Sequence, residues 1–313
     1  MKKQWNEKRY HSLDYELRST FGEKFYKISL DGNMTCPNRD GTLGTRGCIF
    51  CSQGGSGDFA EDRCLSVTEQ IDRGKAQTAA KYHGDGYIAY FQAYTNTYAP
   101  VDRLRRLFSE AIVHPDIRIL SIATRPDCLE DDVLDLLAEL NQVKPVWVEL
   151  GLQTIHEATA CLIRRGYQLP VFENAVSRLR ARGLTVIVHT IIGLPGEDLS
   201  MNLDTVRYLN TLDIQGIKFQ LLHVLKGTDL AVLYETEPFH LPSMEEYIEI
   251  LSRCLVILRP DIVIHRLTGD GPRDLLIAPE WSLDKRRVLN QLQHYLKEHD
   301  LWQGKEFLHD VHI

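Results

Sequence analysis

The feature of this sequence that most constrains its fold is the alternation of apolar strand-like segments with helical ones. Six predicted strands are each followed by a segment whose apolar residues recur at helical spacing. The predicted strands cover residues 24–30, 86–93, 117–124, 145–153, 184–193 and 216–224. Several are near-continuous apolar runs, which is typical of parallel strands covered by helices. We therefore predict an α/β fold, a closed or partly closed (β/α)6 barrel, with a doubly wound open sheet as the alternative.

The C-terminal part of the chain carries one further strand-like segment, residues 262–267, and a helical tail, residues 283–299. No low-complexity stretch or linker separates this part from the rest. We expect residues 1–240 to form a partial barrel with an N-terminal extension. We expect residues 241–313 to form a strand and helix extension packed on that barrel.

Charge and cysteine content narrow the classes of function. The first residues are basic but lead to no apolar run, and no segment reaches the ~18 apolar residues that span a bilayer. We expect a cytoplasmic protein without a membrane partner, where seven cysteines favour metal binding or catalysis over disulfides. The net charge of -7 gives no global footprint of a nucleic-acid binder. Short basic runs leave local phosphate binding open, at residues 102–107, 162–167, 177–183 and 284–288.

Three cysteines lie in a glycine-rich loop that follows the first predicted strand. Cys36, Cys48 and Cys51 have the spacing C-x11-C-x2-C, and the two-residue gap lets the last pair hold one metal centre. A structural zinc would need a fourth ligand, which Cys64 is available to supply. An iron–sulfur cluster on three cysteines would instead keep one iron open. The spacing leaves both open, and a barrel with polar strand ends favours the cofactor site.

Polar residues gather where the predicted strands end, which is where barrels carry their catalytic groups. The segment from His265 to Leu276 is denser in polar groups and glycine than a closing strand requires, so it favours a site. The candidates for contact with a substrate are His189, His223, Lys226, His265, Arg266, Asp270 and Arg273. The remaining cysteines have no partner spacing and are expected to be buried thiols, namely Cys64, Cys128, Cys161 and Cys254.

These motifs together resemble the radical S-adenosylmethionine (radical SAM) enzymes. Phe50 is the aromatic residue that this family places before the last cysteine, and "SLD", "TCPNRDGT" and "GCIFC" match the YtqA/YhcC-like group, including its long first gap. Four later motifs are similar in sequence and order to that group, to the elongator catalytic subunit and to coproporphyrinogen dehydrogenase. They are "TRPD" (124–127), "ELGLQT" (149–154), "IRRGY" (163–167) and "HTIIGLPGED" (189–198).

The resemblance implies a partial radical SAM barrel and a set of cofactor ligands. Cys36, Cys48 and Cys51 would hold a [4Fe–4S] cluster whose open iron binds SAM, and flavodoxin or ferredoxin would supply the electron. Glu149, Gln153 and Arg165 would contact SAM directly. In place of the family's Gly-Gly-Glu motif, Gln92, Tyr94 or Asn96 would bind the amino group. The remaining cofactor contacts expected are Phe50, Thr124, Ile191 and Ile192.

The resemblance also implies a substrate. The relatives split two ways: elongator-type enzymes act on the C5 side chain of the wobble uridine in tRNA, and the porphyrinogen enzymes oxidatively decarboxylate a side chain. The resemblance to the YtqA/YhcC-like group implies the wobble uridine, converted from carboxymethylaminomethyl to aminomethyl. His265, Arg266 and Arg273 would hold the carboxylate of that side chain as the catalytic group of residues. Two alternatives remain open, a radical SAM enzyme that acts on a small molecule and a zinc-stabilised binding protein without redox chemistry.

Overall fold

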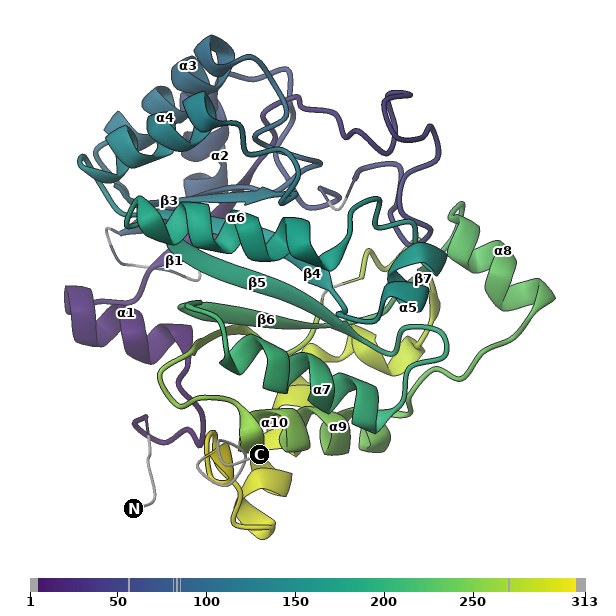
Figure 1. The fold of residues 1–313 in the computed structure, drawn as a ribbon. Coiled ribbons are helices and arrows are strands. Elements are labelled where there is room, and N and C mark those ends of the chain that lie inside the picture. The colour runs from purple at the N-terminus through teal and green to yellow at the C-terminus, as the bar shows by residue number, and fades with distance from the viewer. Residues whose placement is uncertain are drawn as a thin grey trace.

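A computed structural model describes residues 5–55, 57–80, 82, 84, 86–269 and 271–307. Its main feature is one curved sheet of seven parallel strands, in the order β1-β2-β3-β4-β5-β6-β8 (Figure 1). The strands are β1 (Tyr26–Leu30), β2 (Tyr87–Phe91), β3 (Ile117–Thr124), β4 (Val146–Gln153), β5 (Thr185–Ile192), β6 (Gly216–Leu221) and β8 (Val263–Arg266). Neighbours in the sheet follow one another along the chain, so the connections between them all wind in one direction. The sheet is curled into a half-barrel (Figure 1).

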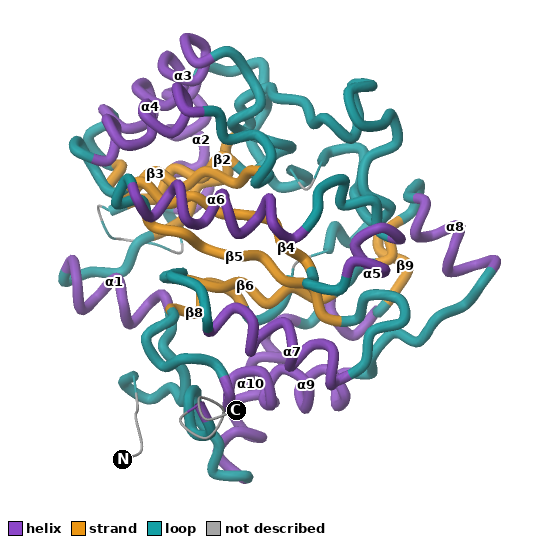
Figure 2. Tube along the Cα trace, viewed as in Figure 1, coloured by secondary structure: helices purple, strands orange, loops and turns teal. Residues whose placement is uncertain are grey.

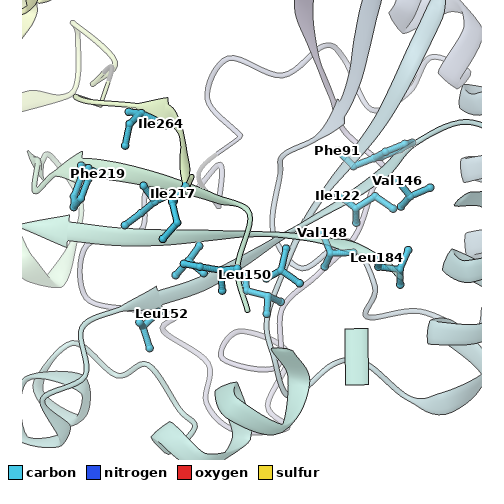
Figure 3. Packing of buried hydrophobic residues seen from close by; sticks show 14 of the residues in the cluster. Phe91, Ile122, Val146, Val148, Leu150, Leu152, Leu184, Ile217, Phe219 and Ile264 are labelled. Carbon is cyan, nitrogen blue, oxygen red and sulfur yellow. The ribbon is translucent and has the colours of Figure 1, made fainter. Parts of the chain in front are cut away.

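Helices in the connections between strands cover the outer face of this half-barrel (Figure 2). They are α2 (Val67–Thr78), α3 (Val101–Val113), α4 (Asp131–Asn141), α6 (Leu169–Ala181), α7 (Leu199–Asn210) and α9 (Met244–Ile257). Local sequence sets where two of them begin: α2 and α9 each start at a capping box, formed by Ser66 with Glu69 and by Ser243 with Glu246. Their apolar faces pack with strand residues such as Phe91 into one large core (Figure 3).

The inner face of the sheet differs from the outer one because successive strand residues point to opposite sides. On β4, Val148 and Leu150 face the helices, whereas Trp147, Glu149 and Gly151 face inward. An apolar layer closes the end of the half-barrel at which the strands begin. It is completed by Leu17 of α1 (Leu13–Phe21) and consists of Leu17, Phe25, Ile88, Ile119, Trp147 and Ile187.

The elements beyond the strands' carboxyl ends build the opposite rim. They include α5 (Glu157–Leu162), α8 (Asp229–Thr236), the 3-10 turn η1 (Glu280–Leu283), and β7 (Val224–Leu225) paired antiparallel with β9 (Leu276–Ala278). In Figure 1 the loop between β1 and α2 reaches the same side as α5 and α8. The last described helix, α10 (Lys285–Glu298), packs against α9.

The structure confirms the predicted partial barrel with a C-terminal extension and adds to it. All six predicted strands are present, and the predicted segment 262–267 forms β8, a seventh strand parallel to β6. The doubly wound alternative is wrong, because such sheets reverse their strand order and this one does not. The division at residue 240 stays a prediction, and β8 beyond it belongs to the same sheet. None of the helices in the described segments is long and apolar enough to cross a membrane.

Candidate functional site

A cavity of about 670 Å³ opens at the carboxyl ends of the strands. Its volume lies within the range of roughly 300–1,000 Å³ that is usual for ligand sites. Strand ends, the cysteine loop and the segment after β8 all line it. Eleven of the predicted site residues are on its wall: Cys36, Cys48, Phe50, Cys51, Gln92, Thr124, Glu149, Gln153, Arg165, Arg266 and Arg273. The tertiary structure thus brings together side chains that are spread over most of the chain.

Three of the residues predicted to bind the cofactors or to form the catalytic group do not line this cavity. Asn96 is fully buried, and its amide donates to the carbonyl oxygens of Phe91 at 3.1 Å and Ala123 at 2.9 Å, so it ties the end of β2 to β3. Ile192 packs in the outer core, while its neighbour Ile191 faces the cavity, because adjacent strand residues point to opposite faces. Contact between Asn96 or Ile192 and a cofactor in the cavity therefore does not follow from the structure.

His265 is the third residue away from the cavity wall. Its ring packs edge-on against Trp147, with ring centres 5.1 Å apart, at the level of the apolar layer. Burial lowers the pKa of His265 well below its usual range, and Lys27 adds to this effect. A neutral histidine at this depth contributes packing beneath the cavity. Only Arg266 and Arg273 of the predicted catalytic group reach the cavity, and Asp270 lies outside the described residues.

The cysteine loop is held in shape by Arg39. Its guanidinium donates to the carbonyl oxygens of Cys51 at 3.2 Å and Ser52 at 2.6 Å, while the backbone N–H of Arg39 donates to Cys36 at 2.8 Å. One residue thus links the first and the last of the three loop cysteines. Gly47 has a φ of 77°, and a Cβ there would lie 2.8 Å from the Arg39 side chain, so glycine is needed for this close approach.

The segment after α5 docks against the cysteine loop through its backbone carbonyl groups. Ile49 N–H donates to Ile163 at 3.2 Å, and the Asn38 amide donates to Arg164 at 2.7 Å. Gly166 follows with a φ of 83°, and a Cβ there would lie 2.6 Å from the Asn38 side chain. The "IRRGY" motif therefore supports the cysteine loop through its backbone carbonyl groups.

Arg165 is buried with only 2% of its surface exposed, and its guanidinium is engaged within the protein. It donates to the carbonyl oxygens of Tyr167 at 2.9 Å and Thr154 at 2.6 Å, and it pairs with Glu157 at 3.0 Å. These contacts fold the chain between β4 and α6 around the side chain. Its role as a SAM ligand stays a prediction, and the contacts present make it a positioning residue.

Arg125 is a site residue whose role the sequence reasoning missed, although its motif "TRPD" carried the signal. It lines the cavity and pairs with both carboxylate oxygens of Asp127, at 2.9 and 2.7 Å. Its remaining nitrogen donates to the carbonyl oxygen of Arg165 at 2.8 Å. Arg125 therefore places a positive charge beside the cysteine loop while connecting β3 to the segment that supports the loop.

Glu149 is the centre of a group of polar side chains that lies between the apolar layer and the cavity. One of its oxygens accepts from Lys27 at 3.0 Å and Ser121 at 2.7 Å, and the other accepts from His189 at 2.7 Å and from Lys218. Burial opposes ionisation, yet Lys218 and Lys27 hold the pKa of Glu149 well below its usual range. Both of its oxygens are thus bonded within the protein, and its predicted contact with SAM stays a prediction.

Glu149 has more than one cationic neighbour, and their mutual repulsion changes the pKa values of the basic groups around it. Burial lowers the pKa of Lys218 well below its usual range, and the charges of Lys27 and Arg266 act in the same direction. Burial and Lys218 also lower the pKa of His189 to about 4, so this ring is neutral near pH 7. Sequence reasoning missed Lys27 and Lys218, although each interrupts an apolar strand and that interruption was the available signal.

Two arginine side chains on the cavity wall have no polar partner in the part of the chain that the structure describes. Neither the Arg266 nor the Arg273 guanidinium forms a hydrogen bond or ion pair with a described residue, although both residues line the cavity. Lys226 differs, because its amine donates to the carbonyl oxygen of Asp274 at 3.1 Å and it does not line the cavity. His223 and His189 do line it. The wall is therefore suited to an anionic ligand.

Cys48 of the cysteine loop has the character expected of a metal ligand. Hydrogen bonding with Cys51 lowers the pKa of the Cys48 thiol to about 7 against the effect of burial, and Arg125 contributes. A thiolate is the form that binds metal. Among the described residues no three Cys, His, Asp or Glu side chains converge on a point that would hold one ion. A [4Fe–4S] cluster would bind each of the three cysteines to a separate iron, whereas a structural zinc would need a fourth ligand.

The other cysteines divide into two groups. Cys128 and Cys254 are buried, and burial raises the pKa of each thiol to about 12, which confirms the expectation of buried thiols. Cys64 and Cys161 are exposed, so the same expectation was wrong for them. Cys64 also lies off the cavity wall that carries the other three loop cysteines, which argues against a four-cysteine site.

Comparison with known proteins gives matches over nearly the whole chain. The radical SAM superfamily domain matches residues 41–209, and the radical SAM C-terminal domain matches residues 214–298. The uncharacterized protein YtqA of Bacillus subtilis is 47% identical over 301 residues, covering 96% of this chain and 94% of YtqA. The protein YhcC of Escherichia coli is 36% identical over 285 residues, covering 91% of each chain.

More distant proteins match over part of their length. The tRNA uridine(34) acetyltransferase of Methanocaldococcus jannaschii is 25% identical over 185 residues, which are 58% of this chain and 33% of that protein. The solved structure of the archaeal Methanocaldococcus infernus Elp3 covers 89% of this chain and 64% of that chain, with a TM-score of 0.67 and 17% identity. At this identity the likeness shows a shared fold.

Proposed function

This chain belongs to the radical SAM superfamily, as an enzyme of the YtqA/YhcC family, and we propose on that premise that it cleaves SAM to modify tRNA. The proposed cofactors are a [4Fe–4S] cluster on Cys36, Cys48 and Cys51, and SAM bound beside it. One observation carries the proposal: these cysteines line the same cavity at the strand ends as Arg266 and Arg273, whose guanidinium groups pair with none of the described residues.

When bound and reduced, the cluster would supply the electron that splits SAM into methionine and a radical able to abstract hydrogen. The chain's own part is to position the reactants and exclude water. Arg39 and the segment 163–166 hold the cysteine loop in place, and Arg125 sets a positive charge beside it. The cavity volume of about 670 Å³ leaves space for a ligand beside the loop.

We propose the wobble uridine of tRNA as the substrate, with its carboxymethylaminomethyl side chain entering the cavity. Arg266 and Arg273 would bind the carboxylate of that side chain, since a guanidinium matches a carboxylate through paired hydrogen bonds. The distant relatives named tRNA uridine(34) acetyltransferase support the choice of nucleoside. We expect the enzyme to work in the cytoplasm, with flavodoxin or ferredoxin as electron donor.

The proposed conversion balances without an external oxidant. SAM, water and the carboxymethylaminomethyl nucleoside would give methionine, 5′-deoxyadenosine, glyoxylate, a proton and the aminomethyl nucleoside. The hydrogen abstracted would be one on the methylene carbon between the amine and the carboxylate. The electron that starts SAM cleavage is regained when the substrate radical is oxidised to an imine, which water then hydrolyses.

The test is an anaerobic assay of the reconstituted enzyme with dithionite, SAM and tRNA that carries the carboxymethylaminomethyl group. We expect 5′-deoxyadenosine and glyoxylate in equal amounts, and a nucleoside mass lower by the carboxymethyl group. A Cys51→Ala enzyme is the matched control and should form neither product. SAM cleavage with unchanged tRNA would indicate a small-molecule substrate, and a colourless protein that retains no iron would indicate the zinc alternative.

A further inference from the structure

We propose that a second cavity beside the first binds the nucleotide next to the modified uridine in RNA, an inference that rests on the proposed function. This second cavity has a volume of about 400 Å³. It lies between the start of the cysteine loop and the loop that follows β2. Its lining consists of Asn33, Met34, Thr35, Arg39, Arg63, Tyr94, Tyr98 and Arg103.

The lining combines three guanidinium groups with two aromatic rings, and no described residue in it is acidic. Arginine binds phosphate through paired hydrogen bonds, and tyrosine rings provide surfaces on which unstacked bases lie. A nucleotide of a single-stranded RNA loop presents both groups side by side. The composition therefore fits a phosphodiester with an adjoining base.

The arginine charges are in place without being neutralised. Arg39 donates to the carbonyl oxygens of Cys51 and Ser52, and Arg103 donates to that of Asn33 at 2.7 Å. Carbonyl groups orient a guanidinium but leave its full charge. Arg63 is exposed and forms no hydrogen bond or ion pair with the described residues, and the nearby Asp62 interacts with it only through its charge. An anion entering this cavity would meet two guanidinium groups that are already oriented, those of Arg39 and Arg103, and the exposed one of Arg63.

The two cavities share a wall, which links the second one to the reaction. Arg39 and Tyr94 line both of them, and the Arg39 guanidinium carbon lies 5.7 Å from the centre of the Tyr94 ring. Tyr94 is itself fixed, because its hydroxyl donates to the carbonyl oxygen of Gln53 at 2.5 Å. A uridine in the first cavity would thus place a neighbouring nucleotide at the second.

The test measures binding of a fluorescent anticodon stem-loop to the full-length protein at several salt concentrations. Arg63→Gln should weaken binding about ten-fold, as expected for one charge-assisted contact, and should reduce the slope of log affinity against log salt by about 0.7. Arg118→Gln is the matched control and should change neither, because Arg118 is equally exposed but lies at the opposite end of β3.

Two further measurements separate phosphate contact from stacking. Tyr98→Leu should weaken binding roughly ten-fold, whereas Tyr98→Phe should not, because it loses only the hydroxyl, which contacts Thr42 and Asp40, and keeps the ring. A neutral methylphosphonate on the 5′ or the 3′ side of the wobble uridine should weaken binding to the wild type. At the phosphate that Arg63 contacts, on one of these two sides, the methylphosphonate should not weaken the binding of Arg63→Gln any further.

The outcomes distinguish the two proposals. If the wild type binds and modifies the RNA while Arg63→Gln and Tyr98→Leu match Arg118→Gln, the second cavity is not a nucleotide site and the proposed function stands. If the wild type neither binds the stem-loop nor alters its uridine, both proposals are overturned. Additive effects of Arg63→Gln and of both methylphosphonates would refute the phosphate contact specifically.

Discussion

Glu149 on β4 and Lys218 on β6 form an ion pair inside the half-barrel, reaching across the intervening strand β5. Glu149 is fully buried and Lys218 is 2% exposed. Lys27 on β1 joins the same carboxylate at 3.0 Å. One buried side chain therefore connects three strands through charge, directly beneath the cavity that the cysteine loop lines.

The first prediction follows from this connection. Glu149→Gln should lower the free energy of unfolding by about 3–5 kcal/mol, because it leaves Lys218 buried without a counter-charge. The matched control is Glu139→Gln, which breaks an exposed pair with Arg105 and should change stability little. Urea unfolding measures both. Equal stability of the two variants would contradict the central role of Glu149.

The second prediction concerns pH. The pKa of His189 is about 4 in the folded protein, against 6.5 for an ordinary histidine, because of burial and Lys218. Between these values the unfolded chain binds a proton that the folded chain does not. Stability from this group is therefore present above pH 6.5 and lost as pH falls toward 4, by about 1.4 kcal/mol per pH unit.

The measurement compares the wild type with His189→Gln from pH 7 to pH 4.5. The difference in free energy of unfolding should shrink as pH falls, since the variant lacks the group that resists protonation. Glu149, Lys218 and Arg266 face His189 and stay common to both proteins. The exposed His294→Gln serves as control. A difference that does not vary with pH would show that His189 does not titrate as stated.

The third prediction identifies the cluster ligands. Cys36→Ala, Cys48→Ala and Cys51→Ala should each lose most iron and sulfide after anaerobic reconstitution. Cys64→Ala should keep the iron content and visible spectrum of the wild type, because that thiol is exposed and off the cavity wall. Loss of metal from Cys64→Ala would instead point to four cysteine ligands.

The fourth prediction tests how the cysteine loop is supported. Gly166→Ala and Gly183→Ala both place a side chain at a left-handed φ, 83° and 72°, at a similar cost of about 1–2 kcal/mol. Only the Cβ at position 166 meets another group, the amide of Asn38 at 2.6 Å. Gly166→Ala should therefore also reduce cluster loading, measured as iron per chain. Equal iron in both variants would argue against support of the cysteine loop by segment 163–166.

Much of the fold was predictable because its signals are local. Apolar runs and helical spacing depend on neighbouring residues, so all six predicted strands are present, and the spacing of Cys48 and Cys51 predicts a metal-binding loop. The site was predictable only in part. Gln92 and Asn96 look alike as polar residues after β2, yet one lines the cavity and the other is enclosed between strands.

By itself, the sequence determined the order of strands and helices, the three loop cysteines and the motifs at the strand ends. Only the tertiary structure decided which polar residues meet. Glu149 meets Lys27 and Lys218 because curling the sheet brings β1, β4 and β6 around one interior, and strands that far apart in the chain share no local pattern. A shift of one residue along a strand also exchanges its inner and outer faces, which is why Ile191 and Ile192 could be told apart only in three dimensions.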